Sequence, residues 1–140
     1  DGIPAEMLAD AIDPINASLR GHCPAAEWAK TLISSDMEIL AAGRPYALLS
    51  ESEKWRVDAL IGAAIAEMSG LRLLVLDRFD VLDSKGREDL MFWLDGAVAD
   101  GQIDTALIFG TMKALPAGLP ETITPVWIEG GIAGEMREAA

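Results

Sequence analysis

Two short runs of apolar residues, separated by an amphipathic segment, constrain the fold of this chain more than any other feature. The runs are "LRLLVLD", residues 71–77, and "TALIFGT", residues 105–111. Uniformly apolar runs of this length are typical of strands that are buried on both faces of a parallel sheet. The segment between them places Leu90, Leu94 and Val98 on one helical stripe. Strand, helix and strand in this order predict a right-handed parallel crossover, and therefore an α/β fold.

A second amphipathic segment leads directly into the first apolar run. Residues 50–70, "SESEKWRVDALIGAAIAEMSG", carry apolar side chains at helical spacing, and Gly70 stands where a helix C-cap belongs. At the start of this helix, Ser50 and Glu53 have the S-x-x-E spacing of a capping box. A helix start with serine hydroxyls and unpaired backbone N–H groups can also bind an anion. The motif by itself leaves both interpretations open, capping alone and anion binding.

The N-terminal part predicts smaller elements. Residues 3–20 have helical spacing that Pro14 interrupts, which predicts a bent helix or two short helices. Residues 36–50 read as a small antiparallel hairpin that turns at Gly43. No repeat or linker divides the chain, so residues 1–140 are expected to form a single domain.

A third apolar run follows a proline-rich loop near the C-terminal end. We expect Leu73–Leu76, Ala106–Phe109 and Pro125–Ile128 to be strands of one sheet, with the first two strands parallel.

The composition indicates one globular domain with a strong negative charge. Of the 140 residues, 51% are hydrophobic, and the formal net charge is -12. A field of that sign repels nucleic acid and anionic membranes, so any DNA contact has to come from another chain or from a local basic patch, which the sequence lacks. The single cysteine, Cys23, excludes an internal disulfide and fits a reducing compartment, and no apolar run is long enough to span a bilayer. These features favour a cytoplasmic location, and a start at Asp1 rather than at a methionine suggests a fragment or a processed chain.

Acidic residues follow the first apolar run. Asp77 ends the run, and Asp80 and Asp83 come shortly after it. Ligands of parallel α/β sheets gather at the carboxyl ends of the strands, where a carboxylate can hold Mg2+, often through water. Aspartate is also common in turns, so this position alone does not distinguish a metal site from a turn.

The order of these motifs resembles the C-terminal lobe of an ABC-type ATPase head of the SMC/RecF/RecN group. "LSESEK", residues 49–54, is similar to the LSGGE signature of that family, and "LLVLD", residues 73–77, to its Walker B strand. "VLD", residues 81–83, resembles its D-loop, and "TALIFGTM", residues 105–112, the strand that leads to its switch-histidine loop. The resemblance covers most of the chain, including the hairpin before the signature.

The resemblance implies a fold, namely the C-terminal half of a P-loop (ABC-type) ATPase head. Its parallel strands would have flanking helices and would be preceded by a small antiparallel hairpin. Residues 1–22 would be the helix that leads in from a coiled coil or an N-terminal region, and residues 36–50 the hairpin. Residues 50–140 would comprise the signature helix, the Walker B strand and the α/β units that follow.

The resemblance also implies a site, cofactors and partners. Asp77 would hold Mg2+, and Asp83 would lie at a dimer interface. Ser50, Ser52 and Glu53 belong to the signature, which would contact ATP held by the opposite head. The partners would be an N-terminal lobe with a Walker A loop and a second identical head that is joined through ATP.

The family acts in DNA repair, recombination and chromosome maintenance. The resemblance therefore implies that any DNA contact is made by the full-length assembly, in the cytoplasm or at the nucleoid, without membrane contact.

This sequence departs from the family pattern at several positions. Glu51 and Ser52 replace the two signature glycines, and Arg78 stands where the family has a catalytic glutamate. The segment from Asp77 to Asp83 is one residue shorter than usual, and Met112 occupies the switch-histidine position. No G-x-x-x-x-G-K-[ST] phosphate loop occurs in the sequence.

These departures predict weakened hydrolysis, because a guanidinium stays protonated and cannot act as a general base. Asp80 is a candidate for the missing base. ATPase activity would require completion by a lobe with a Walker A loop. The alternative hypothesis is a non-catalytic pseudo-ATPase that keeps the fold and serves as an interaction module.

Side chains outside the motifs suggest only packing. Trp55, Phe92 and Trp93 fall in expected helices and are predicted to pack in the core or between lobes. Trp28 is interpreted in the same way, and His22 as an ordinary surface or loop residue.

Overall fold

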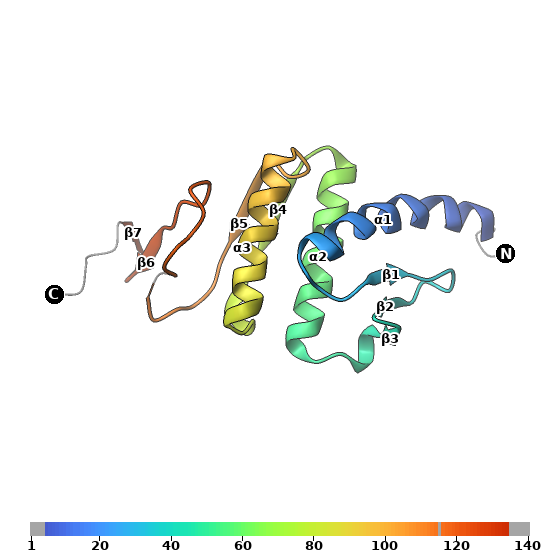
Figure 1. Ribbon diagram of the computed structural model, residues 1–140, viewed down its shortest axis with the longest axis horizontal. Helices are drawn as coiled ribbons and strands as arrows, with labels where there is room; N and C mark the ends of the chain where they lie inside the picture. Colours follow the sequence, from blue (N-terminus) through green and yellow to red (C-terminus); the bar gives the residue numbers. More distant parts are fainter. Residues whose placement is uncertain (1–4, 115, 135–140) are drawn as a thin grey trace.

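The computed structural model describes residues 5–114 and 116–134, which form a mixed α/β structure (Figure 1). The α/β class expected from the sequence is confirmed. None of the described helices is long and apolar enough to cross a membrane. In chain order the elements are α1 (Ala5–Ala25), β1 (Thr31–Ile33), β2 (Ile39–Ala41), β3 (Arg44–Pro45), α2 (Glu51–Ser69), β4 (Leu73–Leu76), α3 (Ser84–Ala99), β5 (Thr105–Ile108), β6 (Trp127–Glu129) and β7 (Ile132–Gly134), with 3-10 turns at Tyr46–Leu48 and Phe79–Val81.

The parallel crossover predicted from the two apolar runs is confirmed. β4 pairs with β5 in parallel, from Leu73 opposite Thr105 to Leu76 opposite Ile108, and α3 connects the two strands. Leu74 and Leu76 are buried in the main core, together with side chains of α2 and α3. Gly62 lets α2 approach closely, because a Cβ there would lie 3.2 Å from Leu74 Cδ1.

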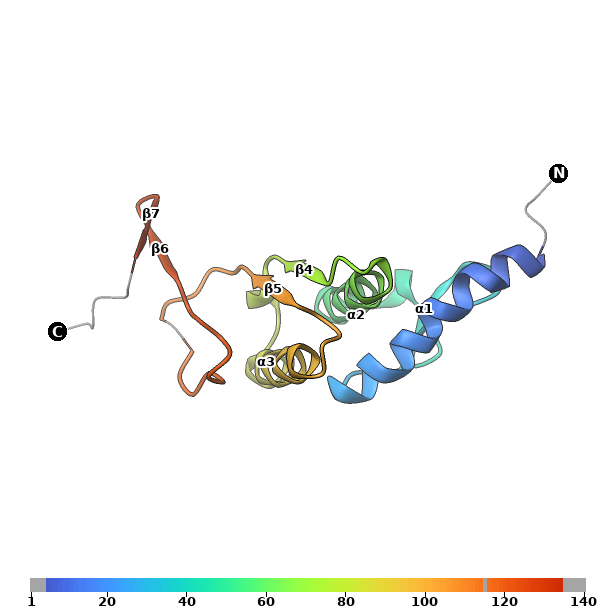
Figure 2. The ribbon, with the colours of Figure 1, turned by 90° about the horizontal axis from the view of Figure 1, so that it is seen from above.

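Burial of both sheet faces was expected, and the structure contradicts this. Leu73 is 39% exposed, Val75 56%, Leu107 45% and Phe109 46%. Figure 2 shows β4 and β5 along one side of the helices, and no other described element covers their second face. The strands are uniformly apolar, as in a parallel sheet that is covered on both faces, but the described residues cover only one face.

The third strand does not join this sheet. β6 pairs antiparallel with β7, with Trp127 opposite Gly134, in a hairpin that stands apart from the helices (Figure 1). Gly130 and Gly131, with φ of 57° and 78°, make the two-residue turn between these strands. A Gly-Gly pair favours such a local hairpin, and this pairing replaced the expected long-range one.

The N-terminal part agrees with its prediction in one respect and differs from it in another. α1 is one helix that extends to Ala25 with Pro14 inside it, so of the two alternatives, one bent helix or two short helices, the described residues form a single helix. The expected hairpin around Gly43 corresponds to β2 and β3, and the sequence pattern missed β1, which pairs antiparallel with β2. α1 contributes Leu19 and Cys23 to the main core.

Leu90 is fully buried in α3, whereas Phe92 on the same helix is 59% exposed, so Phe92 does not pack in the core of this chain and its packing between lobes stays a prediction. We expect Leu90→Ala to lower the free energy of unfolding by about 2–5 kcal/mol, because it removes buried methyl groups and leaves a cavity. Phe92→Ala, the matched control, should change it by less than about 0.5 kcal/mol. Urea denaturation of both variants measures the difference, and equal effects would contradict the placement of α3.

Candidate functional site

The candidate site lies where three segments meet: the start of α2, the loop after β4 and the loop after β5. Only residues 70–72 separate α2 from β4, so the chain reverses and the start of α2 lies beside the end of β4. Trp55 Nε1 donates to the backbone oxygen of Asp77 at 2.8 Å, which joins the first two segments. Phe79 N donates to Phe109 O at 3.1 Å, which joins the second and third.

The start of α2 is the predicted capping box. Ser50 is the N-cap, its hydroxyl accepts from Glu53 N at 3.3 Å, and the Glu53 carboxylate accepts from Ser50 N at 2.8 Å. Glu53 also forms an ion pair with Arg44 of β3. The backbone N–H and hydroxyl of Ser50, followed by Arg44, hold the pKa of Glu53 down to about 2. Ser52 lies beside this box, its Oγ 3.5 Å from Ser50 Oγ.

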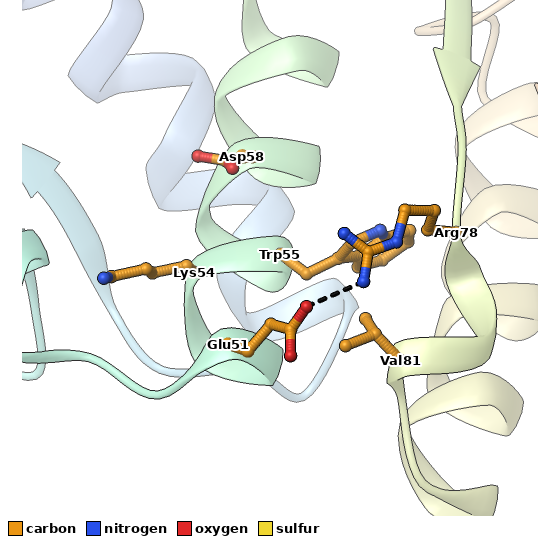
Figure 3. A pocket seen from close by; sticks show the side chains of 6 residues that line it. All are labelled: Glu51, Lys54, Trp55, Asp58, Arg78 and Val81. Carbon is orange, nitrogen blue, oxygen red and sulfur yellow. Dashed lines mark hydrogen bonds and ion pairs between the residues drawn. The ribbon is translucent and has the colours of Figure 1, made fainter.

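The loop after β4 begins with Asp77 and Arg78. The Asp77 carboxylate is exposed, and its Oδ1 accepts from Arg78 N at 2.7 Å. Arg78 has a left-handed backbone, with φ 56° and ψ 38°, a conformation that non-glycine residues rarely adopt. Its side chain points to the start of α2, where Nη2 lies 2.7 Å from Glu51 Oε1 (Figure 3).

An open cleft of about 300 Å³ lies between these two segments. Its lining residues, drawn in Figure 3, are Glu51, Lys54, Trp55, Asp58, Arg78 and Val81. The Arg78 side chain therefore forms an ion pair with Glu51 across the cleft.

Asp80 has a defined structural contact. Its Oδ1 accepts from Thr111 N at 3.0 Å in the loop after β5, and its backbone oxygen accepts from Arg87 Nη2 at 2.8 Å. The two loops approach so closely that a Cβ at Gly110 would clash with the ring of Phe79. One carboxylate oxygen of Asp80 thus holds the two loops together.

Asp83 is the N-cap of α3. Its Oδ1 accepts from Gly86 N at 2.8 Å and lies 3.4 Å from Arg56 Nη2, while the side chain stays largely exposed. This position suits a residue at the surface that also fixes the start of a helix.

Asp77 is the one candidate metal ligand that the sequence suggested at this edge. Among the described residues, no group of three or more His, Cys, Asp and Glu side chains is arranged to hold a metal ion. Mg2+ is often bound through one or two carboxylates together with substrate phosphates. The described residues therefore supply one exposed carboxylate at the end of β4, and not a complete set of metal ligands.

The structure brings the signature-like residues and Asp77 to one edge of the sheet, and it places His22 away from it. Met112 is half-buried against the main core. His22 is fully buried in α1 and lies 3.1 Å from Glu67, so its interpretation as a surface or loop residue was wrong. Trp55 and Arg56, which contact Asp77 and Asp83, were not identified as site residues, and their positions in the first turns of the helix after Ser50 were the only available signal.

Comparisons of the chain with models of protein families, with curated proteins and with solved structures found no match. Any functional conclusion therefore depends on the residues at this edge of the sheet.

The capping box predicts a pH dependence of stability. The pKa of Glu53 is lowered from 4.5 to about 2 in the folded chain, so the stability that its carboxylate contributes is present above pH 4.5 and is lost as the pH falls toward 2. In urea titrations over this range, Glu53→Gln should therefore lose less stability on acidification than the unsubstituted chain. Identical pH profiles would contradict the contacts assigned to Glu53.

Proposed function

We propose that this chain is the C-terminal half of an ATP-binding, dimerising head of an SMC/RecF-like ATPase, with weakened hydrolysis. The observation that carries the proposal is the meeting of the capped α2 start with Asp77 at the carboxyl edge of the β4–β5 pair. Ligands of open parallel sheets bind outside this edge, and helix starts favour anions. The sequence order that suggested the family thus corresponds to a spatial arrangement in which a nucleotide phosphate could be approached.

The residue roles follow from this arrangement. Asp77 would hold the magnesium ion, which would neutralise phosphate charge when bound. Ser50, Ser52 and Glu53 would present the start of α2 to a nucleotide held by a second head. Asp83, exposed at the start of α3, would lie at the interface between heads.

The uncovered sheet face supports the need for a second lobe. Strands of parallel sheets are normally covered on both faces, and a two-stranded sheet is marginal by itself. Leu73, Val75, Leu107 and Phe109 provide an apolar surface onto which a lobe with a Walker A loop could pack. DNA would be contacted by other parts of such an assembly, because the net charge of -12 repels it.

A second function, a non-catalytic interaction module, is favoured by one observation. The Arg78 guanidinium pairs with Glu51 across the cleft, where the family has a catalytic glutamate and a glycine. An arginine in this pair cannot activate water, so the cleft would hold a nucleotide without hydrolysing it, or would serve only in binding a partner.

We expect the isolated chain to show negligible binding of Mg-ATP in calorimetry, because it lacks a phosphate loop. Binding should appear when the chain is co-expressed with a lobe that carries a Walker A loop. Asp77→Asn should then weaken binding, whereas Asp100→Asn, an exposed carboxylate at the end of α3, should not. Tight magnesium-dependent binding of ATP by the isolated chain would refute the half-site assignment.

Turnover of the completed head should be slow, because Arg78 stands where the family has its general base. General-base catalysis typically raises a reaction rate by about 10²–10⁴-fold. Arg78→Glu should raise turnover, but it would place two carboxylates opposite each other, because Glu51 faces position 78. The double variant Glu51→Gly/Arg78→Glu removes this repulsion and should be faster than the single variant. Steady-state phosphate release compares them, and a double variant no faster than the original head would argue for the interaction module.

Asp80→Asn tests whether the Asp80 carboxylate acts as the general base in place of the missing glutamate. An asparagine keeps an oxygen for the Thr111 N–H, so the contact between the two loops is retained while the basic carboxylate is lost. Loss of turnover with unchanged nucleotide affinity identifies Asp80 as the surrogate base. Fast hydrolysis that survives this change would mean that the alignment of Asp77 and Arg78 with the family motif is wrong.

A further inference from the structure

We infer that Trp28, which lies between α1 and β1 and outside every motif, is the positioning residue for Asp77 and Asp83. Trp28 is 8% exposed and contacts neither carboxylate directly. It packs against the side chains of two consecutive α2 residues, Trp55 and Arg56, and each of these contacts one of the two aspartates. The inference rests on the proposed function, because it takes Asp77 and Asp83 as site residues.

The first connection runs through Trp55. The ring centroids of Trp28 and Trp55 are 6.3 Å apart with an interplanar angle of 76°, an edge-to-face arrangement that aromatic pairs prefer. This contact holds the Trp55 indole so that its N–H reaches the backbone oxygen of Asp77 at 2.8 Å. The hydrogen bond fixes the backbone of Asp77, directly after the end of β4, and therefore the position from which the Asp77 carboxylate extends.

The second connection runs through Arg56. Its guanidinium carbon lies 5.8 Å from the centroid of the Trp28 ring, within the range of a cation–π interaction. Nη2 of the same guanidinium lies 3.4 Å from Asp83 Oδ1, the oxygen that also caps α3. The Trp28 ring therefore supports the cation that lies beside Asp83.

Trp28 in turn packs against Trp93 of α3, which is hydrogen-bonded to His22 of α1. Its ring centroid lies 5.4 Å from that of Trp93, which is 1% exposed. Trp93 Nε1 donates to His22 Nδ1 at 3.2 Å, and the other ring nitrogen of His22 lies 3.1 Å from Glu67 Oε2. These contacts make the position of Trp28 depend on the packing of all three helices.

The indole N–H of Trp28 does not explain its position. Nε1 is buried and has no hydrogen-bond partner among the described residues. The ring face and edge therefore carry its interactions, and phenylalanine offers both without the unpaired donor. Leucine is also apolar and smaller than tryptophan, but it has no aromatic ring with which Arg56 could form a cation–π interaction or Trp55 an edge-to-face contact.

The comparison of Trp28→Phe with Trp28→Leu in the whole chain tests this inference. The readouts are the 1H–15N NMR shifts of the Asp77, Arg78, Asp83 and Gly86 amides and of the Trp55 indole N–H. The Phe variant should keep these shifts, and the Leu variant should change them. Ile103→Ala is the control for general destabilisation, because Ile103 is fully buried in the same core but precedes β5, at the other end of the sheet. If Trp28→Leu does not fold, Trp28→Met replaces it.

The inference would be overturned if the Phe and Leu variants changed these chemical shifts equally, or if Ile103→Ala changed them as much as Trp28→Leu does. In the head completed by a lobe with a Walker A loop, Trp28→Leu should weaken Mg-nucleotide binding by about 10–100-fold, as loss of a supporting partner of a metal ligand does, and Trp28→Phe should largely restore it. If the original completed head binds no nucleotide, the proposed function fails, whereas the NMR comparison still decides the role of Trp28.

Discussion

The parallel pairing of β4 with β5 is the constraint on which the rest of the structure depends. Because the two strands run in the same direction, the loops that follow them leave from one edge and bond to each other through Phe79 and Phe109. The short connection at residues 70–72 then returns the start of α2 to that edge. A slip of one residue in this pairing would turn a strand's core-facing side chains to the open face, so register and site geometry are fixed together.

The sequence predicted what local patterns determine. Apolar residues at helical spacing, together with short apolar runs, were sufficient to predict the β4–α3–β5 unit. The S-x-x-E spacing was sufficient to predict the capping box at Ser50. The burial of His22 and the contacts of Trp28 could not be predicted, because they depend on how three helices pack and not on neighbouring residues. The exposed face of β4 was missed for a related reason: apolarity shows that a strand is suited to burial, and it does not show which chain supplies the cover.

Glu51 and Arg78 differ from the motifs of the ATPase family that the sequence resembles. Considered separately, they suggest two defects in the proposed site: an acidic charge where phosphate would bind, and a cation where a general base would stand. In the fold these residues, Glu51 and Arg78, face each other at 2.7 Å, so each neutralises the other. Both side chains are about 70% exposed, and an ion pair of this kind contributes little to stability. Its consequence is electrostatic, because the mouth of the cleft carries no net charge from this pair and therefore does not repel an approaching anion as Glu51 alone would.

The open face of the β4–β5 sheet also bears on the behaviour of the chain in solution. Parallel strands with an uncovered apolar face and free edges offer a template for association with other copies. A net charge of -12 on 140 residues opposes such association, because like-charged molecules repel each other over about one Debye length, roughly 10 Å at 0.1 M salt. The acidity of the chain thus also opposes association between copies in solution, and this opposition weakens as ionic strength rises.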